Sequence, residues 1–178
     1  MAILEILTYP DDQLRALCEP VTDFDNPEFQ QFIDDLLETM HDAPGCVGIA
    51  APQVGRPIQV VAIDCSLARH PPEGHHGLML ACNPEILSWS GMEVGREGCL
   101  SLPDYTGNVV RAVEAQLQFQ DRTGQTQSHM LTGFEARVAQ HEVDHLEGRM
   151  FIDRVVSRRA DMFPRKQYQS RRSKKSSN

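Results

Sequence analysis

The sequence contains no run of apolar residues approaching the roughly 18 that a membrane-spanning helix needs. The first residues also lack a basic segment ahead of an apolar stretch, because Glu5 interrupts the short apolar run and Pro10 ends it. A secretory signal is therefore not expected. These absences disfavour an integral membrane protein and an exported protein, and they favour a cytoplasmic one.

The number and spacing of the cysteines do not indicate disulfide pairing. The chain has five cysteines, an odd number, and no two of them form a C-x-x-C pair. In a reducing compartment we expect free thiols, so a secreted scaffold held by disulfides is disfavoured. The five are Cys18, Cys46, Cys65, Cys82 and Cys99.

Lysine is absent from the first 165 residues, and charge is unevenly distributed along the chain. The net charge is -8, from 17 basic and 25 acidic residues, and nine of the basic but only one of the acidic residues lie in 154–178. Residues 1–153 therefore carry 8 basic and 24 acidic residues, a net charge of -16. Phosphate contacts need lysine and arginine, so we expect no specific DNA binding by this acidic part.

The hydrophobic pattern predicts an α+β fold with largely antiparallel sheets. Asn26 and Pro27 suit the N-cap and first position of a helix, and apolar residues then recur at helical spacing to about Met40. Strands and a second helix follow without βαβ alternation. The strands are predicted at 58–64, 78–82, 113–119 and 125–132, and the second helix at 134–148.

The second predicted helix contains the pattern H-E-x-x-H. His141 and His145 are four residues apart, so both imidazoles lie on one face, one turn apart, where they can bind one metal ion. Glu142 lies one position further round, within reach of a water on that metal but not placed as a ligand. This spacing predicts a catalytic metal site.

The third ligand has to come from upstream, because catalytic sites of this kind use three protein ligands and keep one open position. No glutamate follows Glu147, and the extended pattern that would supply a third histidine has Phe151 instead. Cys99, in a segment expected to be a polar loop, is the strongest candidate. Its competitors are His41, His70, His75, His76 and His129.

Three motifs resemble those of the peptide deformylases, in the order in which that family has them. They are 48–53 (Gly-Ile-Ala-Ala-Pro-Gln), 97–101 (Glu-Gly-Cys-Leu-Ser) and 140–146 (Gln-His-Glu-Val-Asp-His-Leu). The resemblance covers the chain to about Val155. One departure stands out: Cys46 occupies a position two residues before the first motif where the family usually has glycine.

The resemblance implies removal of the N-formyl group from the initiator N-formylmethionine of newly synthesised polypeptides. It implies Fe²⁺ as the metal, with Zn²⁺, Ni²⁺ or Co²⁺ as alternatives, held by Cys99, His141 and His145. A metal-bound hydroxide would attack the formyl carbon, with Glu142 as general base and then general acid. A zinc metallopeptidase of the H-E-x-x-H type is the alternative interpretation.

The resemblance also implies supporting roles. The side-chain amide of Gln53 and the backbone N–H of Leu100 would stabilise the oxyanion. Glu97 and Arg111 would form a buried ion pair. Asp144 would either orient a ligating histidine or pair with a basic side chain. Plain surface charge is the alternative interpretation in both cases.

The substrate pocket is expected beside the metal, with apolar walls for the methionine side chain. Its predicted lining residues are Gly48, Ile49, Gly98, Phe134 and Val138.

The charge pattern and the motifs together predict one catalytic domain, 1–155, and a basic C-terminal tail, 156–178. A tail with little apolar content is expected to be disordered. Ribosome contact through its basic residues is the functional interpretation, and a solvated end is the alternative.

Overall fold

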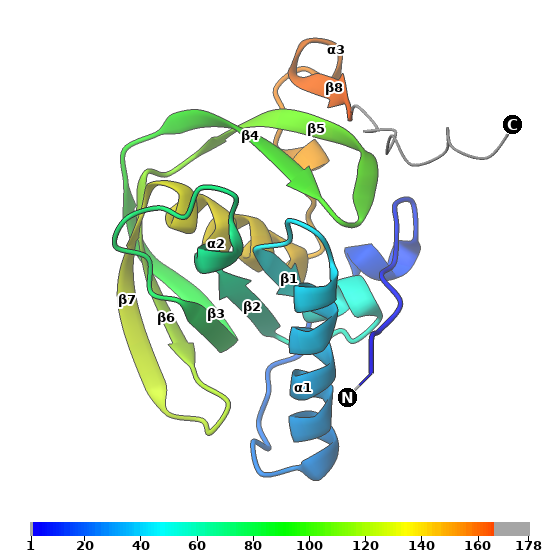
Figure 1. The fold of residues 1–178 in the computed structure, drawn as a ribbon, viewed down its shortest axis with the longest axis vertical. Coiled ribbons are helices and arrows are strands. Elements are labelled where there is room, and N and C mark those ends of the chain that lie inside the picture. The colour runs from blue at the N-terminus through cyan, green and yellow to red at the C-terminus, as the bar shows by residue number, and fades with distance from the viewer. Residues whose placement is uncertain (1, 166–178) are drawn as a thin grey trace, which may run out of the picture.

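The computed structural model describes residues 2–165 (Figure 1). Its largest feature is a five-stranded antiparallel sheet with the order β1-β2-β3-β6-β7, so β1 and β7 are its edges. The strands are β1 (Gly48–Ala50), β2 (Val60–Asp64), β3 (Leu78–Ser90), β6 (Glu114–Gln120) and β7 (Thr126–Thr132).

Two helices cover opposite faces of this sheet, which explains why β2 is buried along its whole length. Val60 and Ala62 pack in a cluster with the first helix, and Val61 and Ile63 pack in a cluster with the second. A strand covered on both faces reads as a continuous apolar run, as 58–64 does. The helices are α1 (Pro27–Asp42) and α2 (Gly133–Leu146).

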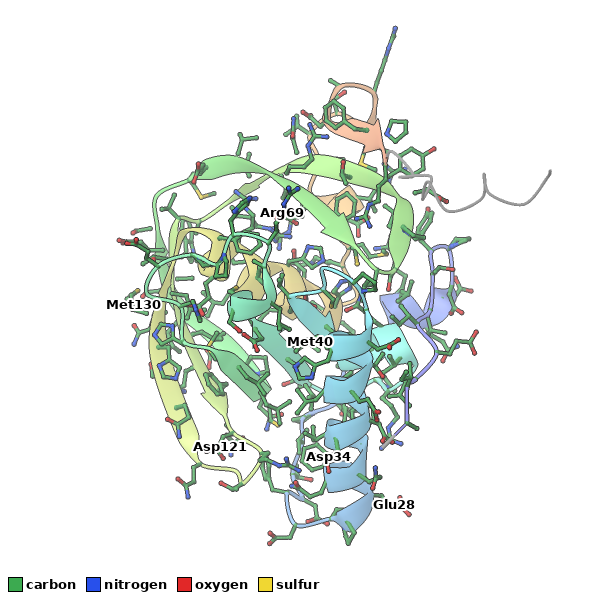
Figure 2. All side chains as sticks on the ribbon, in the orientation of Figure 1. Glu28, Asp34, Met40, Arg69, Asp121 and Met130 are labelled. Carbon is green, nitrogen blue, oxygen red and sulfur yellow. The ribbon has the colours of Figure 1, made fainter. Side chains whose placement is uncertain are left out.

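The first helix begins as the sequence predicts. The side chain of Asn26 accepts hydrogen bonds from the backbone N–H groups of Glu28 and Phe29, and Pro27 takes the first helical position. Glu28 is exposed and projects away from the sheet (Figure 2). The helix ends at Asp42, two residues beyond the prediction.

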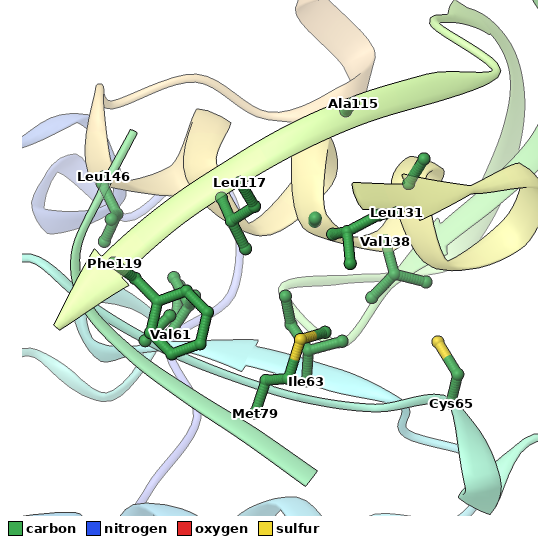
Figure 3. Close-up of a cluster of buried hydrophobic side chains, with 14 of the residues drawn as sticks. Val61, Ile63, Cys65, Met79, Ala115, Leu117, Phe119, Leu131, Val138 and Leu146 are labelled. Carbon is green, nitrogen blue, oxygen red and sulfur yellow. The ribbon is translucent and has the colours of Figure 1, made fainter. Parts of the chain in front are cut away.

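The second helix lies on the sheet through small and branched side chains. Val138 and Leu146 of α2 meet Leu117 and Leu131, which project from β6 and β7 (Figure 3). Packing this face against the sheet leaves the opposite face of α2 directed toward the second sheet.

A three-stranded sheet with the order β4-β5-β8 covers that side (Figure 1). The hairpin β4–β5 was not predicted, because glycines and polar residues interrupt its apolar alternation. Two of these glycines leave room for other side chains: a Cβ on Gly95 would meet the Arg137 guanidinium, and one on Gly107 would meet the Phe151 ring. The strands are β4 (Glu93–Cys99), β5 (Leu102–Arg111) and β8 (Met162–Pro164).

Strand β3 runs to Ser90, well past the predicted end at 82. Asn83 has a positive φ of 50°, and the pairing with β6 shifts register between Cys82 and Glu85. The Asn83 side chain binds both backbone groups of Val21 and the Gln120 amide oxygen, which compensates for the interrupted ladder.

Part of the predicted tail is folded. The short helix α3 (Arg158–Asp161) precedes β8, which pairs with β5, so secondary structure extends past the predicted boundary at 155. The rest of that tail, 166–178, lies outside the described residues. None of the helices in the described part is long and apolar enough to cross a membrane. Four 3₁₀ turns complete the fold over residues 2–165: η1 (Asp12–Arg15), η2 (Ala51–Val54), η3 (Cys65–Leu67) and η4 (Phe151–Asp153).

Candidate active site

Helix α2 presents its two histidines to the interior between the two sheets. His141 and His145 are 8% and 1% exposed, and their ring centroids lie 5.1 Å apart. The predicted arrangement of one helical turn on one face is therefore present. Two polar rings on a buried helix face require a ligand or partners in compensation.

Cys99 meets these histidines from the opposite side. It is the last residue of β4, not part of a loop as expected, and its Sγ lies 3.4 Å from His145 Nε2. Ligand atoms of Cys99, His141 and His145 all lie within 4.8 Å of one another. Of the residues that the structure describes, no competing histidine joins this cluster.

This donor set fits a single divalent metal ion. Tetrahedral bonds of about 2.0–2.3 Å separate neighbouring ligand atoms by roughly 3.5 Å, close to the observed sulfur–nitrogen distance. The buried Nδ1 of His145 has no hydrogen-bond partner within the described residues. Burial alone would raise the pKa of the Cys99 thiol, but His145 and His141 favour the thiolate and hold its pKa well below the usual value.

Glu142 lies beside the cluster without belonging to it. It is 4% exposed, and burial raises the pKa of its carboxyl to about 7. Its Oε2 has no partner among the described residues. The carboxylate passes so close to Gly48 that a Cβ there would lie 2.6 Å from Glu142 Oε1. A buried carboxyl of near-neutral pKa suits proton transfer.

Gln53 reaches the cluster from η2. Its Oε1 accepts a hydrogen bond from the Ala50 backbone, which directs the Nε2 group toward Cys99 Sγ at 3.4 Å and Ser101 Oγ at 3.1 Å. Leu100 lies in the two-residue turn between β4 and β5, next to Cys99. Both Gln53 and Leu100 line the pocket in front of the candidate metal ligands.

A buried ionic network orients the site from behind. Glu97 accepts a hydrogen bond from His141 Nδ1 at 2.9 Å and is also bonded to Arg111 and Arg137. Burial opposes its ionisation, but these hydrogen bonds, led by that of His141, lower the pKa of Glu97 to about 2. The ionised carboxylate therefore holds His141 Nδ1 and leaves Nε2 free to bind metal.

Within the described residues, the Asp144 side chain is not bonded to His141 or His145. It pairs with Arg111 and with Arg154, which lies beyond the helix. Of its predicted alternatives, the structure therefore shows pairing with basic side chains, and neither an orienting role nor a plain surface charge. Arg111 thus links Asp144 on α2 to Glu97 on β4.

The pocket in front of this cluster has a volume of about 240 Å³. Of the predicted lining residues, Gly48, Gly98, Phe134 and Val138 line it. Ile49 does not line it, because its side chain is fully buried in the core cluster that contains α1. Sequence reasoning singled out Cys46, which lines the pocket, but missed other lining residues. The missed ones include Arg96, Arg137 and Arg165.

Cys46 donates a hydrogen bond from Sγ to the Gly48 carbonyl at 3.1 Å. Burial raises the pKa of this thiol to about 12, in contrast with Cys99. All five cysteines are free thiols, as expected.

The fold and the site together are those of a mononuclear metallohydrolase, with three residues that could ligate one metal and an adjacent buried carboxyl group. The family model for polypeptide deformylase matches residues 3–161. The chain belongs to the peptide deformylase family, metallohydrolases that remove the N-formyl group from nascent polypeptides. The metallopeptidase interpretation of the helix motif is not favoured.

Individual relatives agree with this assignment. Peptide deformylase 1 of Vibrio vulnificus is 45% identical over 153 residues, covering 86% of each chain. Peptide deformylase of Syntrophobacter fumaroxidans is 43% identical, covering 93% of this chain and 94% of its own.

Solved structures agree as well. A peptide deformylase from Legionella pneumophila has a TM-score of 0.79 at 37% identity, covering 86% of each chain. The Met-Ala-Ser-bound enzyme of Acinetobacter baumannii has a TM-score of 0.80 at 34% identity, covering 86% of this chain and 99% of its own.

Proposed function

We propose that Cys99, His141 and His145 hold one divalent metal ion and that Glu142 transfers the proton during deformylation. One observation carries this proposal: the buried carboxyl of Glu142, with one oxygen lacking a partner in the described chain, lies beside a complete set of three metal ligands. A metal bound there would polarise the formyl oxygen and lower the pKa of a water molecule.

The side chains then divide the reaction between them. Glu142 accepts a proton from the attacking water and delivers it to the leaving amine as the C–N bond breaks, releasing formate. Gln53 Nε2 and the Leu100 N–H donate hydrogen bonds to the formyl oxygen as negative charge develops on it. Glu97 holds His141 in a fixed orientation throughout.

The pocket suits an extended formyl-methionyl peptide. Gly48 on β1 and Gly98 on β4 line opposite sides of it, and each belongs to the edge strand of its sheet. Edge strands offer free backbone groups to an added strand. Phe134 and Val138, which lie before His141 on α2, provide the apolar walls for the methionine side chain.

We propose Fe²⁺ as the metal and the cytoplasm as the location. Affinity order alone would favour Zn²⁺, and Ni²⁺ or Co²⁺ also fit the donor set, so metal availability and site geometry decide among them. A cytoplasmic location follows from the substrate, since nascent formylated chains emerge there.

The ligand assignment is tested by Cys99→Ser. This variant should retain far less metal per chain than wild type, measured by elemental analysis after dialysis. Full metal content together with full activity on formyl-Met-Ala-Ser would contradict the assignment.

The role of Glu142 is tested by Glu142→Ala. The variant should keep its metal and lose at least ~10²-fold in kcat, the usual scale for general acid–base catalysis. A variant that loses metal while its rate per bound metal is unchanged would show that Glu142 is a ligand instead.

We further propose that the basic C-terminal residues contact ribosomal RNA. Residues 166–178 contain five basic residues and no acidic one, which suits phosphate contacts. Deleting 166–178 keeps β8 and should leave turnover of a short formyl peptide unchanged, while ribosome co-sedimentation at low salt falls. Equal sedimentation of both chains across a salt series would identify this segment as a solvated end.

A further inference from the structure

The pocket rim carries arginine on an otherwise acidic protein. Three of its lining residues, Arg96, Arg137 and Arg165, are basic. Among the lining residues that the structure describes, the acidic ones are Glu97 and Glu142, which are 6% and 4% exposed. Arg137 is paired with Glu97, so the exposed charged side chains at this rim are Arg96 and Arg165, both positive, although residues 1–153 carry a net charge of -16.

Arg165 is held at this rim by the C-terminal strand. Its backbone N–H donates to the Asp104 carbonyl at 2.7 Å, extending the pairing of β8 with β5. Its Nη2 lies 2.2 Å from the position that a Cβ on Gly98 would take, so the guanidinium rests directly on the Gly98 backbone. A Cβ at residue 98 would push the guanidinium out of this position.

The Arg165 guanidinium is available to a ligand. Within residues 2–165 no ion pair or side-chain hydrogen bond engages it. Arg96 lies on the same outer face of the hairpin, bonded to Asn108 and Thr106 and stacked 3.5 Å over the Phe163 ring. Arg96 is thus fixed without any carboxylate partner in the described structure.

Strand alternation determines which substrate residue meets these arginines. In β4, Glu97 and Cys99 face α2, whereas Arg96 and Gly98 face outward. A peptide lying along β4 with its methionine side chain against α2 turns the next side chain to the outer face. The residue directly after methionine then points toward Arg165.

We propose that Arg165, assisted by Arg96, binds an acidic side chain at the residue directly after the formyl-methionine. The inference rests on the proposed function, because it assumes that the peptide enters this pocket with methionine against α2. An aspartate or glutamate there meets a guanidinium whose donors have no partner within residues 2–165, in a planar geometry suited to carboxylate. The enzyme accordingly favours nascent chains with an acidic second residue.

The test compares peptides that differ only in charge and position. Wild type should hydrolyse formyl-Met-Glu-Ser-amide with kcat/KM about two- to fivefold above formyl-Met-Gln-Ser-amide, the scale of an exposed ion pair. The preference should shrink at high salt. A glutamate at the third residue, in formyl-Met-Ser-Glu-amide, should give no such preference over glutamine there.

Substitution of Arg165 tests whether this residue causes the preference for the glutamate peptide. Arg165→Ala should abolish the preference by lowering the rate on the Glu peptide alone, and Arg165→Lys should retain part of it. Arg159→Ala, an exposed arginine on α3 outside the pocket lining, is the matched control and should behave as wild type. An equal gain on both peptides in Arg165→Ala would instead make Arg165 an obstruction and overturn the proposal.

Calorimetric binding of the product peptides Met-Glu-Ser-amide and Met-Gln-Ser-amide separates the two proposals. If wild type hydrolyses neither formyl peptide, the proposed function fails, and the binding ratio alone then decides the role of Arg165. Equal kcat/KM values with equal affinities would overturn the Arg165 proposal while leaving the deformylase function intact.

Discussion

Gly48 determines where the carboxyl group of Glu142 can lie. A Cβ at this residue would lie 2.6 Å from Glu142 Oε1 and 3.0 Å from the two neighbouring side-chain carbons. The absent side chain is what allows the carboxylate to lie between β1 and the proposed metal ligands. A motif glycine here serves close approach and does not serve a left-handed turn, since its φ is not positive.

Gly48→Ala should therefore displace Glu142 and lower kcat by about 10- to 100-fold, since a misplacement of about 1 Å has costs of that order. Metal content should be unchanged, because no ligand touches the new methyl group. Gly77→Ala, whose Cβ would meet nothing within 4 Å, is the control for a loop glycine and should keep wild-type kcat. Unchanged kcat in Gly48→Ala would show that Glu142 tolerates the displacement.

At the level of elements, the C-terminal end of α2 depends on the N-terminal segment. Gly148 ends the helix with a positive φ of 68°, and its N–H donates to the His145 carbonyl. The Arg15 side chain binds the Gly148 carbonyl, and the Cys18 N–H binds that of Leu146. The turn that carries His145, the proposed metal ligand, is thereby tied to residues that precede both sheets.

Gly148→Ala should lower the free energy of unfolding more than any loop glycine does. The left-handed backbone costs about 1–2 kcal/mol for a non-glycine residue. A Cβ would also lie 2.5 Å from the Arg15 backbone oxygen, which adds roughly 1–3 kcal/mol for displaced backbone. Gly74 also has a positive φ, of 74°, but open space around it, so Gly74→Ala carries only the backbone cost. Urea unfolding of both variants therefore separates the backbone cost from the cost of the Arg15 contact. Equal losses of unfolding free energy in the two variants would mean that the Arg15 backbone moves aside without measurable cost.

At the scale of the whole molecule, the site places several ionisable groups in the protein interior, where their charges affect the free energy of unfolding. Arg111 is 3% exposed and joins Glu97 and Asp144 across the space between α2 and the second sheet. Such a paired network tolerates burial because each charge has partners. Among residues 2–165 Glu142 has no such ion-pair partner, and its burial raises its pKa from 4.5 to about 7.

The raised pKa of Glu142 predicts a pH-dependent cost in the metal-free protein. The unfolded chain releases this proton near pH 4.5 and the folded chain near pH 7, so stability falls as pH rises between these values. Glu142→Gln should equal wild type below pH 4.5 and exceed it by roughly 1–3 kcal/mol above pH 7. Denaturant unfolding of chelator-treated protein across this range measures the difference. If the difference in unfolding free energy between Glu142→Gln and wild type did not change with pH, it would not arise from ionisation of Glu142.

Much of the candidate site could be predicted from local sequence patterns. Helical spacing placed His141 and His145 on one face with Glu142 beside them, because a four-residue separation has one outcome once the segment is helical. The N-cap at Asn26 and the continuous apolar run of β2 were likewise read from neighbouring residues. The absence of a ligand after His145 pointed upstream to Cys99, which the structure brings to the cluster.

Other features needed the folded chain, because they depend on what residues distant in sequence leave open. The β4–β5 hairpin has weak local signals, since its glycines make space for Arg137 and Phe151 from other elements. The side chain of Ile49 points into the core because of the way β1 joins the sheet. The sequence motif that contains Ile49 does not specify this arrangement. Arg165 reaches the pocket only because β8 pairs with β5, placing a residue of the basic C-terminal region on Gly98, 67 positions earlier in the sequence.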